Sequence, residues 1–258
     1  MESLSYLEEL FGLTGKSAIV TGASRGLGAS MAVALARAGA KLVLVGRQAN
    51  LDATHERVRA VGGEAVQVVC DQTTPAGVEE VVATCLSSWG SVDVLVNNAG
   101  TFVRKPALEW TAAEWDEVVE LSMGTVFALC LRAGREMLAQ GSGKIINIAS
   151  VLAFQGGYTV PAYAASRHGL VGLTQALANE WASRGVNVNA IAPGYMDTDL
   201  LADLKADPVR ERELLVRVPA GRWGRADEID GACLFLASPA SDFMHGTTVV
   251  VDGGWLSR

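Results

Sequence analysis

Seven short runs of apolar, largely β-branched residues recur along the chain. Each run is too short to span a membrane and too uniformly apolar for a strand with one wet face, which is typical of buried parallel strands. The runs lie at 17–20, 41–45, 65–69, 92–96, 144–149, 186–191 and 247–251. Helical segments separate them, at 27–38, 51–61, 76–88, 111–139, 162–183 and 226–236. This alternation predicts one doubly wound α/β domain over residues 1–258, with a seven-stranded parallel sheet and helices on both faces.

One segment, at about 199–218, departs from this pattern. It is charged, contains Pro208 and follows an expected strand end. We predict that it forms a mobile helical lid over a site. A solvated connector is an equally good interpretation of the same composition.

The composition disfavours several classes of partner. The formal net charge is −7 and the basic residues are scattered, so neither nucleic acid nor an anionic membrane is expected. The four cysteines lack C-x-x-C spacing and the three histidines lack metal-ligand spacing. The first residues lack the basic and apolar regions of a signal peptide. We therefore expect a cytoplasmic protein with reduced thiols, no metal and a small-molecule substrate.

A glycine-rich turn follows the first expected strand and opens the next helix. Residues 21–28 read T-G-A-S-R-G-L-G. Glycines there allow a tight turn and a close approach of the backbone to a pyrophosphate, and the helix N-terminus offers free N–H groups. The placement predicts a dinucleotide site of the Rossmann type. Its candidate ligands are Gly22, Ser24, Arg25, Gly26, Leu27 and Gly28.

The end of the second expected strand bears on the choice of dinucleotide. An acidic residue there would bind the adenosine ribose of NAD, but this strand ends in Gly46 and Arg47. Arg47, with Arg25 or Ser24, can instead face a 2′-phosphate. We therefore predict a preference for NADP(H), with NAD(H) possible. The alternative is that Arg47 is only a surface residue.

Tyr163 and Arg167 form the most informative pair in the chain. They stand at i and i+4 of an expected helix, so they share one face. A cation beside a phenol lowers the cost of the phenolate, so Tyr163 can exchange protons with an alcohol or a ketone. Ser150 follows an apolar run thirteen residues upstream, and it can supply a second hydrogen bond to the same oxygen.

From about Leu13 to Trp255, these motifs resemble the short-chain dehydrogenase/reductase family. The resemblance implies that Asp71 contacts adenine and that the N-N-A-G sequence at 97–100 lets the cofactor lie against the backbone. It implies that the segment at 193–198 surrounds the carboxamide, and that the protein is a homotetramer built on the helices at 111–139 and 162–183. The additional cofactor contacts that it implies are Asn98, Ala99, Gly100, Tyr163, Arg167, Pro193, Gly194 and Thr198.

The catalytic residues depart from the family at two positions. The family uses Asn, Ser and Tyr-x-x-x-Lys, and by position these map to Ser122, Ser150, Tyr163 and Arg167. Arginine keeps the charge but does not release a proton as lysine can, and serine lacks the amide of asparagine. We therefore expect attenuated turnover, which an Arg167→Lys substitution would raise.

Four C-terminal segments narrow the resemblance further, namely those at 147–157, 189–196, 219–224 and 252–256. They are similar to the gluconate 5-dehydrogenase and 2-dehydro-3-deoxy-D-gluconate 5-dehydrogenase group. The resemblance implies hydride transfer to or from a secondary alcohol or ketone of a sugar acid, such as a keto-deoxygluconate. The alternative is an NAD(P)-binding protein with impaired turnover, which acts as a sensor or partner subunit. Arg104 is a candidate for the substrate carboxylate, although the sequence favours a solvated arginine at this position. Candidate pocket walls, for each of which simple core packing is the alternative, are Phe154, Gln155, Tyr158, Tyr195 and Met196.

Overall fold

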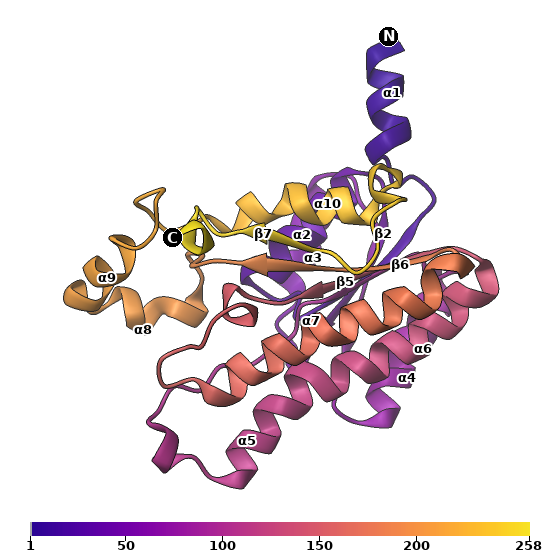
Figure 1. The fold of residues 1–258 in the computed structure, drawn as a ribbon. Coiled ribbons are helices and arrows are strands. Elements are labelled where there is room, and N and C mark those ends of the chain that lie inside the picture. Colours follow the sequence, from indigo (N-terminus) through magenta and orange to yellow (C-terminus); the bar gives the residue numbers. More distant parts are fainter. Residues whose placement is uncertain (1) are drawn as a thin grey trace.

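The computed structural model of the protein describes residues 2–258, without the side-chain environments of residues 2–4, 200, 202 and 203. Seven parallel strands form one sheet in the order β3-β2-β1-β4-β5-β6-β7 (Figure 1). The strands are β1 (Ser17–Thr21), β2 (Lys41–Gly46), β3 (Ala65–Val69), β4 (Val94–Asn97), β5 (Gly143–Ile148), β6 (Val186–Pro193) and β7 (Thr248–Val251). The predicted fold class is therefore confirmed.

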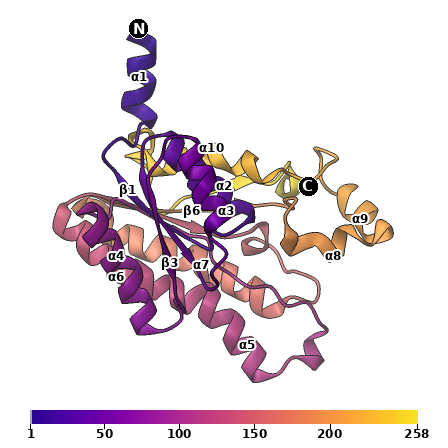
Figure 2. The same ribbon diagram turned by 180° about the vertical axis from the view of Figure 1, so that it is seen from behind.

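The helices cover both faces of the sheet (Figures 1 and 2). The α-helices are α1 (Glu2–Phe11), α2 (Gly26–Arg37), α3 (Asp52–Ala60), α4 (Pro75–Trp89), α5 (Ala112–Val119), α6 (Thr125–Gln140), α7 (Pro161–Trp181), α8 (Ala202–Lys205), α9 (Pro208–Leu215) and α10 (Asp230–Ala237). Single 3₁₀ turns lie at Ala107–Glu109, Val151–Ala153, Ala182–Arg184, Asp199–Leu201, Ala226–Ile229, Pro239–Ser241 and Trp255–Ser257.

Two apolar layers hold these helices to the sheet. Side chains of α2, α3 and α10 pack on one face, around Met31, Leu35 and Leu236. Side chains of α4, α6 and α7 pack on the other face, around Leu129, Leu170 and Trp181. Both faces of the central strands are therefore buried, which explains why their sequences are continuously apolar.

Two features differ from the predicted elements. The helix expected at 111–139 is interrupted by a π-helical turn, Glu120–Gly124, between α5 and α6. A π-helical turn contains one residue more than an α-helical turn would. The apolar stripe continues on each side of it, so the periodicity of the sequence did not indicate this turn. The other difference is α1, which was not predicted and projects away from the body of the domain (Figure 1).

The strand order positions the functional residues. The chain runs outward from β1 through β2 to β3, and then returns to pair β4 with the other side of β1. This reversal opens a crevice beyond the carboxyl ends of β1 and β4, which is where ligands of doubly wound sheets bind. No helix in the described part of the chain is long and apolar enough to cross a membrane.

Candidate active site

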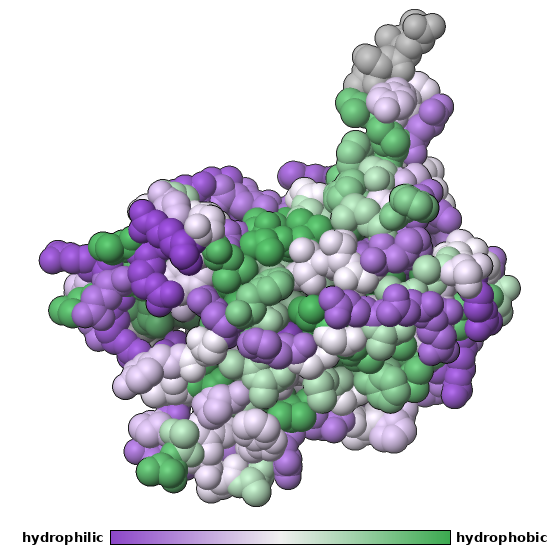
Figure 3. Space-filling model, viewed as in Figure 1, coloured by the Kyte–Doolittle hydropathy of each residue, from purple (hydrophilic) through white to green (hydrophobic). Residues whose placement is uncertain are grey.

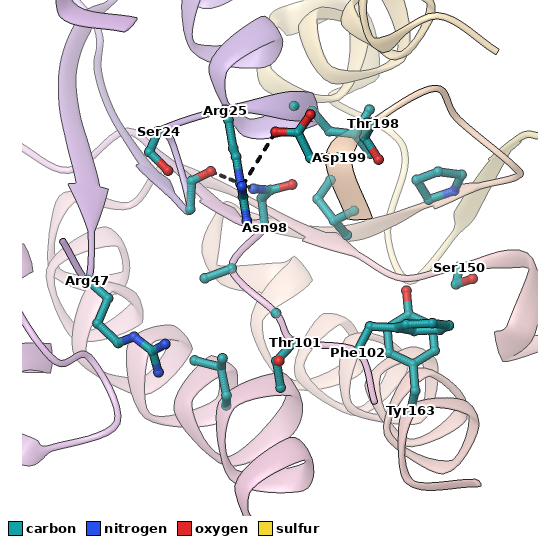
Figure 4. A pocket seen from close by; sticks show the side chains of 18 of the residues that line it. Ser24, Arg25, Arg47, Asn98, Thr101, Phe102, Ser150, Tyr163, Thr198 and Asp199 are labelled. Carbon is teal, nitrogen blue, oxygen red and sulfur yellow. Dashed lines mark hydrogen bonds and ion pairs between the residues drawn. The ribbon is translucent and has the colours of Figure 1, made fainter. Parts of the chain in front are cut away.

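A cavity of about 740 Å³ lies along the carboxyl edge of the sheet. Loops that follow β1, β2, β3, β4, β5 and β6 contribute to its wall (Figure 4). Every predicted catalytic or cofactor-binding residue lines this cavity except Gly28 and Ser122. Residues separated by more than 170 positions in the sequence, such as Gly22 and Thr198, therefore share one cavity.

The loop after β1 has the geometry of a phosphate-binding turn. Gly22 and Gly26 have φ angles of 63° and 55°, which favour glycine. A Cβ at Gly28 would collide with the carbonyl oxygen of Gly22, so this position requires glycine for space. In the described chain, no side chain caps the N-terminus of α2, which begins at Gly26. The N–H groups of this first turn are consequently suited to an anionic ligand.

Asn98 holds this loop in place. Its Nδ2 donates to the carbonyl oxygens of Thr21 and Gly22, at 2.9 and 3.2 Å. In return, Thr21 Oγ1 accepts from the backbone amides of Asn98 and Ala99, both at 3.0 Å. The N-N-A-G segment thus joins the end of β4 to the end of β1, and it presents Ala99 and Gly100 to the cavity.

Two arginines of the cavity have different surroundings. Arg47 is exposed at the end of β2, near Asp71. The hydroxyl and the amide of Thr73 lower the pKa of Asp71, and the charge of Arg47 adds to this effect. Arg25 instead pairs with Asp199, at 3.4 Å, and lies between Ser24 and Asp199 in Figure 4. Ser24, Arg25 and Arg47 all line the cavity, and their joint contact with a 2′-phosphate stays a prediction.

Ser150 and Tyr163 meet at the other end of the cavity. Their hydroxyl groups point toward the same space in Figure 4. The Oγ of Ser150 accepts a hydrogen bond from the Leu152 amide at 3.1 Å, which orients the serine at the start of a 3₁₀ turn. The edge-on ring of Phe102 supports Tyr163, with centroids 5.2 Å apart. A phenol and a hydroxyl held in this way can both hydrogen-bond one carbonyl oxygen.

Arg167 lies behind Tyr163 and is only 5% exposed. Its Nη1 donates to the carbonyl oxygen of Ile148 at 2.9 Å, and its guanidinium carbon lies 4.7 Å from the centroid of the Tyr163 ring. The pair therefore shares one helix face, as the spacing predicts. The cation is held over the face of the ring by a backbone bond to β5.

Ser122 is fully buried in the π-helical turn. Its hydroxyl has no hydrogen-bond partner among the described residues, and neither has the Nε of Arg167. Both side chains approach Gly100. A Cβ at Gly100 would lie 2.5 Å from Nη2 of Arg167 and 3.9 Å from Oγ of Ser122. Ser122 thus contributes to the layer beneath the cavity rather than to its wall.

The remaining wall residues only partly match the sequence prediction. Tyr195 and Met196 line the cavity, whereas Phe154, Gln155 and Tyr158 do not. Phe154 and Tyr158 are exposed instead, because the turn after Ala153 carries them to the surface. Phe102 was missed, and so was Asp199; no local sequence signal marks either one.

Arg104 is half-buried in the wall rather than solvated. Burial lowers the pKa of its guanidinium, and the nearby charge of Arg210 lowers it further. The guanidinium lies 5.2 Å from the ring centroid of Phe102, which itself contacts Tyr163. This places a desolvated cation one side chain away from the phenol. Within residues 2–258, no group of three or more potential ligands is arranged to hold a metal.

A family profile described as enoyl-(acyl carrier protein) reductase matches residues 22–256. The chain belongs to the short-chain dehydrogenase/reductase family. It is 47% identical to the 2-dehydro-3-deoxy-D-gluconate 5-dehydrogenase of Dickeya dadantii, over 96% of this chain and 98% of that protein.

Two crystal structures resemble the fold closely and contain a nucleotide. One is a protein of Agrobacterium tumefaciens with bound NADP, at 45% identity and a TM-score of 0.91, covering 96% of this chain and 99% of that one. The other is a gluconate 5-dehydrogenase of Burkholderia cenocepacia in complex with NADP and tartrate, at 38% identity and a TM-score of 0.93, covering 97% and 99%. Their nucleotide agrees with the predicted cofactor preference.

Proposed function

We propose that the protein is an NADP(H)-dependent oxidoreductase that interconverts a secondary alcohol and a ketone of a sugar acid, such as a keto-deoxygluconate. Two observations carry this proposal. Ser150 and Tyr163 meet at one end of the cavity (Figure 4), and the half-buried Arg104 lies against Phe102, which contacts Tyr163. The first two residues suit a carbonyl oxygen, and the third suits a carboxylate. The names of the relatives point to the same substrate class.

The residues present fit a nicotinamide dinucleotide, which supplies or accepts the hydride when bound. The uncapped N-terminus of α2 suits the pyrophosphate, and the glycines at 22 and 28 allow close contact. Asp71 is assigned to the adenosine end, where Arg47 suits a 2′-phosphate. Pro193, Gly194 and Thr198 are assigned to the carboxamide, at the end of β6. NAD(H) remains a second ligand of the same site.

In the proposed reaction, Tyr163 donates a proton to the substrate oxygen during reduction and accepts it during oxidation. Ser150 hydrogen-bonds the same oxygen, and its own bond to the Leu152 amide keeps it oriented. Arg167 provides a constant positive charge over the face of the phenol ring, next to the group that transfers the proton. Because a guanidinium does not deprotonate, Arg167 cannot pass on the proton, and we propose that turnover is attenuated for this reason.

Arg104 gives the proposed substrate its orientation. A carboxylate placed between Arg104 and Arg210 would offset the repulsion that lowers the pKa of Arg104. The relatives carry enzyme names, so they do not support the alternative of a sensor without turnover.

The segment at 199–218 is proposed to be a lid. It contains α8 and α9, and its Leu201 lines the cavity. An ion pair links Lys205 to Asp197, and the indole of Trp223 donates to Glu211 at 2.8 Å. If the segment closes on ligand, saturating NADPH together with a sugar acid should slow its cleavage by trypsin. An unchanged cleavage rate would indicate a static connector.

We also propose a homotetramer. Large apolar side chains are exposed on α5, α6 and β7, namely Trp115, Phe127, Leu131 and Val250. Figure 3 shows hydrophobic side chains gathered over the region where Figure 1 places β7 and α10. Burial of such patches between copies is favourable. Light scattering at micromolar concentration should give four times the mass of the chain, and a monomer would contradict the proposal.

A substrate panel tests the proposed function. Sugar acids, the corresponding neutral sugars and simple ketones are assayed with NADP(H) and with NAD(H). We expect activity with sugar acids, and we expect Arg104→Gln to raise KM for the acid by about tenfold while Arg104→Lys raises it less. Equal activity on neutral sugars, or no effect of Arg104→Gln, would exclude the proposed carboxylate contact. Absence of turnover with every compound would refute the enzyme assignment.

A further inference from the structure

The guanidinium of Arg167 occupies a narrow buried slot. We define this slot by Gly100, Ser122, the carbonyl oxygen of Ile148 and the ring of Tyr163. Arg167 bonds the carbonyl and lies over the ring, so two sides of the head group are set by direct contacts. Arg167 is only 5% exposed, so its surroundings, rather than solvent, enclose the head group.

Gly100 forms a third side of the slot. Because it has no side chain, the guanidinium can approach its backbone closely. Its φ angle is not among the positive values of the chain, so any residue can adopt its backbone conformation. The obstacle is Nη2 of Arg167, which would lie 2.5 Å from a Cβ at position 100. A Cβ there would require Nη2 to shift, and this atom belongs to a buried head group that already donates to the carbonyl oxygen of Ile148.

Ser122 closes the slot from below. The π-helical turn directs this residue into the interior, where it is 0% exposed. A Cβ built at position 100 would lie 2.5 Å from Nη2 of Arg167 and 3.9 Å from Oγ of Ser122. A longer side chain at position 122 would therefore enter the volume next to the guanidinium.

We propose that Gly100 and Ser122 are positioning residues for Arg167. Their small size, rather than any hydrogen bond they make, gives the guanidinium its place over Tyr163. The three positions are then coupled, so a larger side chain at position 100 or 122 is tolerated only when Arg167 is replaced as well. The role of the cation rests on the proposed function, because it matters through proton transfer at Tyr163.

This coupling changes the expected effect of lysine at position 167. A lysine is slimmer than the slot, and it has no planar head that spans from Ile148 to Gly100. Arg167→Lys alone should therefore leave the slot underfilled and should not raise turnover. Combining it with Ser122→Asn refills the space, so the double variant should exceed both single variants.

Two double-mutant cycles test the proposal, with the thermal midpoint, the Kd for NADPH and kcat as readouts. In the first cycle, Gly100→Ala is introduced into the wild-type protein and into the Arg167→Lys variant. We expect Gly100→Ala to lower kcat in the wild-type background, with KM for the sugar acid nearly unchanged. In the Arg167→Lys background, the loss should be about tenfold smaller. Equal losses in both backgrounds would overturn the proposal, because Gly100 would then serve only the cofactor or the backbone.

The second cycle uses Ser122 and does not alter the cavity wall. Ser122→Asn should lower the thermal midpoint and kcat in the wild-type background, and Arg167→Lys should rescue both. Ser122→Ala is the matched control, because it removes the hydroxyl but keeps the space; the thermal midpoint and the Kd for NADPH should stay near wild type. If Ser122→Ala is as harmful as Ser122→Asn, the hydroxyl matters and the argument from size is wrong.

The readouts separate this proposal from the proposed function. The thermal midpoint and the Kd for NADPH need no substrate, so an incorrect substrate class would fail the panel and leave the cycles intact. If Gly100→Ala does not fold, the Ser122 cycle decides the question by itself.

Discussion

Removal of Arg47 should weaken the binding of NADP(H) without affecting NAD(H). Arg47 follows the last residue of β2 and lines the cavity. The strand itself ends in Gly46, so an acidic residue that would bind a ribose hydroxyl is not found at this position. Arg25, the other candidate, is paired with Asp199 at 3.4 Å. In the Arg47→Ala variant, a 2′-phosphate would therefore lose its main partner, whereas a ribose hydroxyl would lose little.

The size of this effect follows from the exposure of Arg47. Two unit charges at 4 Å interact by about 1 kcal/mol in bulk water and by about 4 kcal/mol at an effective dielectric constant of 20. Arg47 is exposed and lies near the carboxylate of Asp71, so the lower part of this range applies. A loss of about 1–2 kcal/mol corresponds to a Kd for NADPH raised by about 5- to 30-fold.

Calorimetric titration with NADPH and NADH measures both affinities. Arg59→Ala is a matched control, because Arg59 is an exposed arginine on α3 that pairs with Glu56 outside the cavity. The loss caused by Arg47→Ala should shrink at high salt, since exposed charges are screened. An equal loss of both cofactors would mean that Arg47 supports the loop rather than the phosphate, and no loss would mean that it is only a surface residue.

Three further outcomes are expected. Asp199→Asn should free Arg25 and tighten NADPH binding by up to about fivefold, because an exposed ion pair contributes at most about 1 kcal/mol; weaker binding in calorimetry would show that Asp199 assists the cofactor. Tyr163→Phe should lower kcat by about 10²–10⁴ with an unchanged Kd for NADPH, and a retained rate would refute proton transfer by Tyr163. Burial raises the pKa of Asp230 to about 6, against a hydrogen bond from Ser30, so its ionisation destabilises the fold as pH rises through that value. Asp230→Asn should therefore raise the thermal midpoint by a few degrees at pH 8, for about 1–2 kcal/mol after allowance for partial exposure, by about half as much at pH 5, and by little near the ordinary carboxyl pKa of 3.8. An equal gain at all three pH values would contradict this reasoning.

The sequence by itself determined the elements of the fold and most residues of the candidate site. The alternation of apolar runs and helical segments is a local property of the chain, and it predicted all seven strands. The glycine pattern at 21–28 and the i, i+4 spacing of Tyr163 and Arg167 are local as well, and the residues of both motifs lie where they were expected. Such signals survive folding because backbone geometry and periodicity act over only a few residues.

Only the tertiary structure decided which side chains meet. Arg25 pairs with Asp199, and Arg104 enters a wall with Phe102, through loops that packing brings together. Ser122 is turned inward by a π-helical turn that the periodicity of residues 111–139 did not reveal. The slot of Arg167 depends on β4, β5, α7 and that turn at once, since Gly100, Ile148 and Ser122 come from different elements. Close packing between distant elements sets these contacts to within a fraction of an ångström, and no pattern along a single segment specifies them.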